Sequence, residues 1–387
     1  MNVIFIADKV EKYGATTSFK ELVNRLHNNY DVKPIIISPN NGKISEFAKA
    51  NNFEFHKINY ESVFYYKGKN IFKNILRRNE LQKLIDENEM GELNNLDKII
   101  NIEKIDLIHS NINRNDFGCL ISKKYKIPHI MHLREFADLD FQMYPAKKSY
   151  YRLINENTNQ FIAISNTIKE HWIKKGIDNE KIDIIYNGVD SLKFKPMEKF
   201  NDGFIHIIMS GSIVPTKGQL ELVKAISALS NDKKDKIKVD LYGDGNESYI
   251  NKIKYVIKKN DLKNIITFKG YTQELYKNIG KYDIGITCSR SEAFGRVTAE
   301  YMISGVIPIV SNKGANQELI DNNTNGFVYE YGDYIDLSNK IEKAINLTNE
   351  QKCKLITNAE QKANSKFTAD INAKQIYEEY KKILKLK

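Results

Sequence analysis

Short apolar runs alternate with longer amphipathic stretches along almost the whole chain, and this alternation restricts the fold more than any other feature. Strands that alternate with helical stretches form βαβ units, whose strands lie parallel in one sheet. The sequence therefore predicts an α/β protein with doubly wound sheets. We expect strands at residues 3–7, 34–38, 53–58, 105–110, 128–132, 161–164 and 182–186, then at 205–209, 238–242, 265–269, 283–287 and 306–310.

The length of 387 residues suits two domains of ordinary size better than one. We expect a first domain over residues 1–190 and a second over 191–366, joined around 190–202. Between residues 62 and 104 the strands are too far apart for one crossover, so inserted helices are expected there. The apolar spacing after residue 367 predicts a terminal helix that reaches residue 387.

Composition excludes several classes of protein. Cys119, Cys288 and Cys353 are odd in number and scattered, which argues against a disulfide framework or a zinc site and favours a reducing cytoplasm. No apolar run approaches the roughly 18 residues of a membrane span. At the start of the chain an acid and a base follow the first apolar residues too early for a secretory signal, and this segment predicts a strand instead.

The net charge of +10 is spread over both halves, with +3 in residues 1–190 and +7 in the rest, so nucleic acid is not an expected partner. Residues 67–78 hold five bases and no acid among aromatic and aliphatic residues. This segment is either a solvated helix face or an interfacial helix at an anionic membrane. Bases also cluster at 252–259 and 381–387, where solvated helix faces are expected.

The stretch Glu292-Ala-Phe-Gly-Arg-Val-Thr-Ala-Glu300 predicts a binding site. Glu292 follows the strand at 283–287, in the loop where open α/β sheets bind ligands, and Glu300 would lie on the next helix. The two carboxylates are at most about 12 Å apart, and the backbone N–H groups between them favour an anion. A sugar nucleotide, with hydroxyls at both ends and a diphosphate in the middle, fits this arrangement. Alternatively, Glu292 caps the helix and Glu300 is solvated.

This stretch resembles the Glu-x7-Glu motif of the retaining glycosyltransferases of family 4, and the resemblance extends through the second half of the chain. The further matching segments, in the family's order, are 186–190, 210–218, 239–245, 266–271, 301–308, Glu318 and Gly326. The first half matches more weakly, at residues 13–15 and His132. The resemblance implies the GT-B fold, in which two Rossmann-like domains face each other across a cleft and the terminal helix packs back on the first domain.

The resemblance also implies roles for single residues. Glu292 would hold the sugar, Glu300 the nucleotide ribose and Lys217 the diphosphate. Ser212 stands where the family usually has an arginine, and either Arg290 or Arg296 could supply that charge. The implied catalytic residues are His132, Lys217 and Glu292, and the implied donor-binding residues are Gly14, in a loop facing the cleft, Lys217, Glu292, Phe294, Gly295, Arg296, Val297 and Glu300.

The resemblance implies a retaining, hexosyltransferase-type enzyme of bacterial glycan synthesis that uses a UDP- or GDP-linked sugar, with the donor held by the second domain and the acceptor by the first. The acceptor would be a glycan, a lipid-linked molecule or a protein, and the enzyme would be cytoplasmic, at the inner face of the membrane if residues 67–78 bind lipid. No metal or other cofactor is expected: Asp138-Leu-Asp140 lies outside the family's metal usage, and residues 8–14 lack a nicotinamide fingerprint. The alternatives are a GT-B epimerase or phosphorylase, or a catalytically silent binding subunit.

Overall fold

The computed structural model describes residues 1–11 and 13–386, and the chain forms two compact units. The first consists of Met1–Gly188 together with Ala369–Lys387, and the second of Val189–Thr368. The chain therefore passes from the first unit to the second and returns, so the terminal helix belongs to the first unit. The sequence placed the first boundary at residue 190 and the second at 366.

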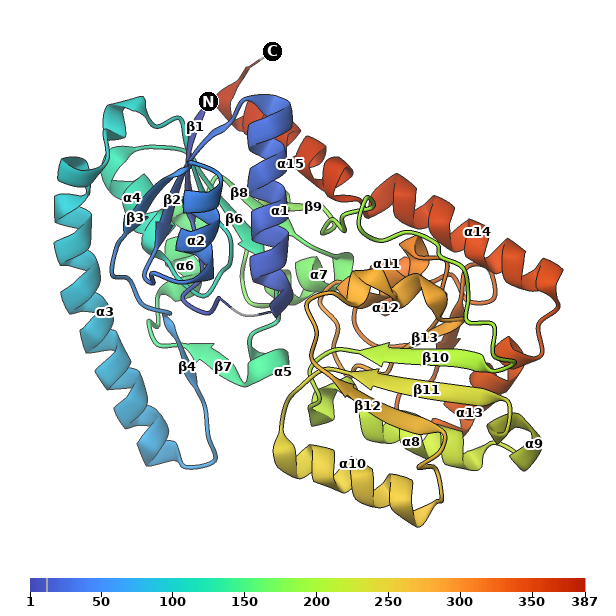
Figure 1. The fold of residues 1–387 in the computed structure, drawn as a ribbon. Helices are drawn as coiled ribbons and strands as arrows, with labels where there is room; N and C mark the ends of the chain where they lie inside the picture. Colours follow the sequence, from blue (N-terminus) through green and yellow to red (C-terminus); the bar gives the residue numbers. More distant parts are fainter. Residues whose placement is uncertain (12, 387) are drawn as a thin grey trace. The chain divides into compact units, whose positions relative to one another are not determined.

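The first unit is built on a seven-stranded parallel sheet with the strand order β3-β2-β1-β5-β6-β8-β9 (Figure 1). A separate two-stranded antiparallel ribbon joins β4 to β7. The strands are β1 (Asn2–Ile6), β2 (Lys33–Ser38), β3 (Glu54–Lys57), β4 (Phe64–Tyr66), β5 (Leu107–Ser110), β6 (His129–Leu133), β7 (Met143–Pro145), β8 (Gln160–Ala163) and β9 (Ile182–Ile184).

Both faces of this sheet are covered, because successive residues of a strand point to opposite sides. Val3 and Phe5 of β1 pack in one apolar cluster with α1, α2 and α15, while Ile4 and Ile6 pack in another with α3 and α4. The helices are α1 (Tyr13–Tyr30), α2 (Lys43–Ala50), α3 (Ile71–Ile99), α4 (Phe117–Tyr125), α5 (Asp138–Phe141), α6 (Tyr150–Asn157), α7 (Asn166–Lys174) and α15 (Ala369–Leu384).

The second unit has a six-stranded parallel sheet with the order β12-β11-β10-β13-β14-β15. Its strands are β10 (Ile205–Ser210), β11 (Ile237–Tyr242), β12 (Ile266–Gly270), β13 (Ile284–Thr287), β14 (Ile307–Ser311) and β15 (Phe327–Tyr329). Its helices are α8 (Gln219–Ala228), α9 (Asn231–Lys234), α10 (Glu247–Lys259), α11 (Arg296–Ile303), α12 (Asn316–Leu319), α13 (Tyr334–Ile345) and α14 (Asn349–Lys366).

The predicted fold class is confirmed, and every strand expected from the sequence is present. The short strands β4, β7 and β15 were not predicted. The interval from residue 62 to 104, where inserted helices were expected, holds β4, the long helix α3 and a short 3-10 helix at Ile102–Lys104. No helix within residues 1–11 and 13–386 combines the length and the apolar character that crossing a membrane requires.

Candidate functional site

Lys217 is held by a tight contact between two loops at the carboxyl edge of the second sheet. It ends a short 3-10 turn after β10, and Gly218 follows with φ of 79°. A Cβ on Gly218 would lie 2.4 Å from the carbonyl oxygen of Cys288, so only glycine allows this approach to the end of β13. The backbone N–H of Arg290 donates to the carbonyl of Thr216 at 2.8 Å and closes the contact.

Glu292 lies in the loop between β13 and α11, and Nζ of Lys217 donates to its Oε2 at 2.9 Å. The glutamate side chain is 16% exposed, so the ion pair is partly shielded from water. A Cβ on Gly314, whose φ is 64°, would lie 2.3 Å from the backbone nitrogen of Glu292. The carbonyl of Glu292 accepts from the N–H of Ala315 at 2.7 Å. The loop after β14 therefore fixes the backbone that carries Glu292.

The start of α11 is built around a glycine and a buried phenylalanine. Gly295, with φ of 92°, is the N-cap and supplies no side-chain cap to the eight-residue helix. The ring of Phe294 is 3% exposed and meets Phe367 edge to face, with centroids 5.7 Å apart. Phe294 is thus a core residue whose backbone, rather than its ring, belongs to the site. The N-terminal amides of such a helix favour a bound anion.

Glu300 lies one turn further along α11 and pairs with Nε of Arg296 at 3.0 Å. Their side chains are only 12% and 16% exposed, so the pair is partly buried. Val297 packs on the apolar cluster of Ile208 and Tyr301, which fixes the opposite side of the helix. Two carboxylates, each paired with a cation, thus lie on either side of the start of α11.

In the first unit, His132 of β6 forms a buried hydrogen-bonded chain with His109 of β5 and Tyr380 of α15. Nδ1 of His132 lies 2.6 Å from Nε2 of His109, and Nδ1 of His109 contacts the Tyr380 hydroxyl. Burial holds the pKa of both histidines well below its usual value, and the charge of Arg134 lowers it further, so both rings are neutral. Nε2 of His132 is buried and has no hydrogen-bond partner among the residues the structure describes.

The order of donors in this chain follows from the surroundings of Tyr380. Its hydroxyl lies among apolar side chains of the first core, where Nδ1 of His109 is its hydrogen-bond partner. We infer that Tyr380 donates to His109, whose Nε2–H in turn donates to Nδ1 of His132, because His109 is the acceptor that this buried hydroxyl contacts. In this order His132 carries its proton on Nε2, which is buried near the carboxyl end of β6.

Two family models match consecutive parts of this chain. The model described as "Glycosyltransferase Family 4" matches residues 13–191, and the model described as "Glycosyl transferases group 1" matches residues 190–362. The chain belongs to the GT-B glycosyltransferases. It is therefore an enzyme that transfers sugars, as the resemblance of its motifs implied.

Relatives and solved structures agree with this assignment. The glycosyltransferase is 28% identical over 345 residues to the uncharacterized glycosyltransferase MJ1178 of Methanocaldococcus jannaschii, covering 86% of this chain and 91% of that protein. It is 25% identical to the UDP-Gal:alpha-D-GlcNAc-diphosphoundecaprenol alpha-1,3-galactosyltransferase of Escherichia coli, over 63% of this chain and 67% of that protein. Its fold matches that of Anabaena HepE, solved with UDP and glucose, with a TM-score of 0.78, 19% identity and coverage of 99% and 100%.

The structure brings together Lys217, Glu292, Gly295, Arg296 and Glu300 of the glycosyltransferase, all in its second unit. His132 and Gly14 belong to the first unit. Gly14 was predicted in a loop, but it lies in the first turn of α1, which begins at Tyr13. The prediction was wrong because the polar residues after Gly14 continue the helical pattern without a break.

The other candidates are also placed by their contacts. Arg296 pairs with Glu300, whereas Arg290 is exposed beside the Lys217 turn, which makes Arg290 the better candidate for the charge absent at Ser212. Asp138 contacts Lys175 and lies 3.1 Å from His171, so it belongs to an ion-pair group on α5.

Sequence reasoning missed a cluster at the carboxyl edge of the first sheet. Arg114, after β5, lies 3.0 Å from Glu135, after β6, and also contacts Asp8, after β1. Burial raises the pKa of Glu135 to about 8 and also raises that of Asp8, while the guanidinium of Arg114 opposes both shifts. The sequence feature that these three residues share is their position, because each follows the end of a buried parallel strand by a few residues.

Proposed function

We propose that this enzyme is a retaining glycosyltransferase that takes a hexose from a UDP- or GDP-linked donor, which its second unit binds. The observation that carries the proposal is the arrangement around α11. A cation, two carboxylates and a helix N-terminus occur within one set of loops at the carboxyl edge of a parallel sheet. A diphosphate flanked by hydroxyl groups is the ligand that this set of charges would complement. The relative that uses UDP-Gal, and the fold match solved with UDP, favour testing uridine donors first.

Each residue then has a defined task. Glu300 accepts hydrogen bonds from the ribose, and Glu292 accepts them from the sugar. The backbone N–H groups of residues 294–297 and the ammonium of Lys217 bind the diphosphate. A bound donor would replace the contact of Lys217 with Glu292 by one to phosphate oxygens, which leaves Glu292 for sugar hydroxyls.

Catalysis follows from where charge develops. Cleavage of the bond between sugar and diphosphate leaves negative charge on the nucleotide, and Lys217 together with the start of α11 lies ready to stabilise it. We therefore propose transfer that needs neither a metal ion nor another cofactor. In this scheme the leaving phosphate helps to deprotonate the acceptor on the same face of the sugar, and His132 of the first unit is a further proposed catalytic residue.

The acceptor is proposed to bind the first unit, where Asp8, Arg114 and Glu135 converge. Carboxylates and a guanidinium of this kind suit a molecule rich in hydroxyl groups. The relatives favour a glycan or a lipid-linked acceptor in the synthesis of a cell-surface polysaccharide, since one acts on a diphosphoundecaprenol-linked sugar and CapM of Staphylococcus aureus belongs to capsular polysaccharide biosynthesis. A protein acceptor is the remaining option.

Thermal unfolding in the presence of a panel of UDP- and GDP-linked sugars tests the proposal, because a ligand of the native state raises its apparent stability. We expect one donor to raise the unfolding midpoint with a chelator present, and the proposal fails if none does. Product analysis separates the alternatives. An epimerase would return an epimerised nucleotide sugar, a phosphorylase would require inorganic phosphate, and a silent subunit would bind donor without releasing nucleoside diphosphate.

A further inference from the structure

The first turns of α3 expose a group of large apolar side chains. Ile71, Phe72, Ile75 and Leu76 are 71%, 80%, 50% and 60% exposed. Positions i, i+1, i+4 and i+5 lie on one face of a helix, so these side chains form a single stripe. Tyr66, at the end of β4, is also 54% exposed just before this segment. Such a continuous exposed stripe marks an interaction surface rather than scattered surface residues.

The stripe is exposed although the helix beneath it is well formed. Asn70 caps α3 by accepting from the N–H of Lys73 at 3.1 Å, and Asn74 exchanges hydrogen bonds with the backbone of Gly68 at 2.8 and 2.9 Å. The apolar face that packs on the core begins later, at Ile85 and Leu93. Figure 1 shows the first turns of α3 extending beyond the sheet of the first unit. The local sequence therefore holds a helix whose first apolar side chains have no core to cover.

The charge along α3 changes sign at a sharp point. Five bases and no acid flank the stripe, namely Lys67, Lys69, Lys73, Arg77 and Arg78. Residues 80–99, in contrast, hold six carboxylates and two lysines. Two of the five contact the fold: Nε of Arg78 donates to the carbonyl of Ala146 at 2.8 Å, and Nζ of Lys67 lies 5.0 Å from the centroid of the Tyr144 ring. The side chains of Lys69, Lys73 and Arg77 are exposed. The basic charge and the apolar stripe thus occupy the same end of one helix.

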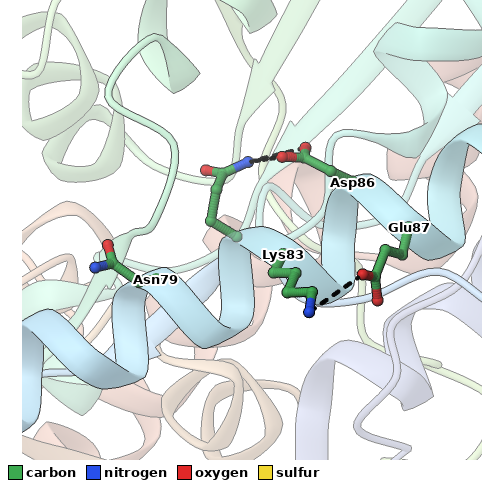
Figure 2. Close-up of a pocket in the computed structure, with 5 residues that line it drawn as sticks. Asn79, Lys83, Asp86 and Glu87 are labelled. Atoms are coloured by element: carbon green, nitrogen blue, oxygen red, sulfur yellow. Dashed lines mark hydrogen bonds and ion pairs between the residues drawn. The ribbon is translucent and has the colours of Figure 1, made fainter.

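Figure 2 shows the acidic part that follows. Asn79, Lys83, Asp86 and Glu87 are among the α3 residues that line an open depression along this part of the helix. Nζ of Lys83 lies 3.7 Å from Oε1 of Glu87, so a carboxylate of the same helix neutralises the charge of this lysine. A negatively charged surface would attract the first turns of α3 and repel this later part.

We propose that residues 67–78, called here the α3 tip, dock the enzyme on the surface of an anionic lipid bilayer. Phe72 and its apolar neighbours would enter the boundary of the acyl chains while the lysines reach lipid phosphates, as the long stems of such side chains allow. Five bases and four apolar side chains suit reversible attachment, which salt weakens by screening. A second copy of the chain that presented the same tip is a poor occupant, because the like charges of the two tips would repel each other.

The inference rests on the proposed function in one respect, since a lipid-linked acceptor would then lie at the surface to which the enzyme docks. Its test does not need that acceptor. Sedimentation of the full chain with vesicles of phosphatidylcholine, with and without phosphatidylglycerol, at low and high salt, measures docking directly. The thermal shift by nucleotide sugars measures the donor site separately, so failure of one proposal is distinguishable from failure of the other.

Two variants and one matched control locate the surface. The first variant is Ile71→Ser, Phe72→Ser, Ile75→Ser and Leu76→Ser together, and the second is Lys69→Gln, Lys73→Gln and Arg77→Gln together. The control, Lys83→Gln with Leu84→Ser, alters an exposed lysine and the 49% exposed leucine beside it on the same helix. Circular dichroism and the midpoint of thermal unfolding confirm that each variant folds.

We expect the unaltered enzyme and the control to sediment with anionic vesicles at low salt, and to be released at high salt or from neutral vesicles. In each tip variant the ratio of bound to free protein should fall at least about tenfold. The apolar groups removed in the first variant, or the three bases removed in the second, contribute more binding free energy than a tenfold change corresponds to. Unaltered protein that ignores anionic vesicles at low salt, or tip variants that bind as well as the control, would overturn the proposal. A protein would then be the better candidate for the occupant of this face.

Discussion

Nζ of Lys217 and Oε2 of Glu292 lie 2.9 Å apart, although the two residues are separated by 75 positions in the chain. The glycines at 218 and 314 make this possible, because each lets a neighbouring loop approach closer than any side chain would allow. The pair joins the loop after β10 to the loop after β13 at one edge of the sheet. We interpret it as the site of the diphosphate and the transferred sugar.

Lys217→Ala should lower turnover more than it lowers donor affinity. The negative charge on the diphosphate grows as the bond to the sugar breaks, and only an interaction that strengthens in the transition state raises the rate. Loss of one such stabilising group costs on the order of 10²-fold in turnover. The measurement compares kcat with the donor dissociation constant, and Lys258→Ala, an exposed lysine on α10, is the control. Equal losses in both quantities would show that Lys217 only binds the ground state.

Glu300→Gln should weaken donor affinity by about one to two orders of magnitude, because a hydrogen bond to a charged group contributes roughly 1.5–3 kcal/mol. The protein should still fold, because the ion pair between Glu300 and Arg296 that the change weakens is only partly buried. Calorimetric titration with the donor found in the panel measures the effect. Glu247→Gln, at an exposed position on α10, serves as the control. Donor affinity that stays the same would contradict the assignment of Glu300 to the ribose.

Tyr380→Phe should loosen the proton arrangement on His132 without touching a substrate. In the inferred order of donors the Tyr380 hydroxyl donates to Nδ1 of His109, so its removal lets His132 populate both neutral tautomers. We expect a stability loss of about 1 kcal/mol, a several-fold lower kcat and an unchanged donor KM.

Nitrogen-15 NMR of the histidine rings reports the tautomers in this experiment. The control is Tyr377→Phe, on the same helix, where the ring stacks on Tyr30 at 4.5 Å. If His132 keeps one tautomer in Tyr380→Phe, and kcat matches that of the control, the hydrogen-bonded chain is only structural.

Glu89 gives a prediction about pH and stability. It is 1% exposed on α3 and lies 3.0 Å from Lys147, which also contacts Asp116 at 2.9 Å. Burial raises the pKa of Glu89 to about 8, and the charge of Asp116 adds to this shift while Lys147 opposes it. The folded protein therefore holds a proton that the unfolded chain releases near pH 4.3.

Because the folded state binds the extra proton, the free energy of unfolding should fall as pH rises from about 4.5 to 8 and then level off, at no more than about 1.4 kcal/mol per pH unit. Glu89→Gln, which mimics the protonated acid, should lack this decline and become the more stable form at pH 8.5. Unfolding midpoints at pH 5.5, 7 and 8.5 measure it. Glu87→Gln, on an exposed part of α3, should follow the unaltered protein. A constant difference between Glu89→Gln and the unaltered protein would mean that Glu89 is ionised throughout.

The parallel strands were predictable because each is a buried apolar run bounded by turn residues, as in Val3 to Ile6. The strand β15 was missed because Phe327, Val328 and Tyr329 form a run too short to stand out. The motif from Glu292 to Glu300 was visible because its charges and glycine lie close together in the sequence.

Contacts between distant segments could not be predicted in the same way. Gly314 acts on Glu292 through the backbone, and nothing in its neighbours signals that approach. The histidine chain depends on Tyr380, which returns to the first unit only after the whole second unit has been traversed. Asp8, Arg114 and Glu135 follow three different strands, and only the strand order β1-β5-β6 brings them together.

The most direct test of the central claim is to follow the fate of nucleotide sugars incubated with the full chain and a chelator, with water as the acceptor, by NMR. The account predicts slow release of nucleoside diphosphate from one UDP- or GDP-linked hexose. The freed sugar should first appear with the anomeric configuration it had in the donor, and Lys217→Ala should slow the release on the order of 10²-fold. Release of the opposite anomer, formation of an epimer or a sugar phosphate, or no release from any donor would contradict it.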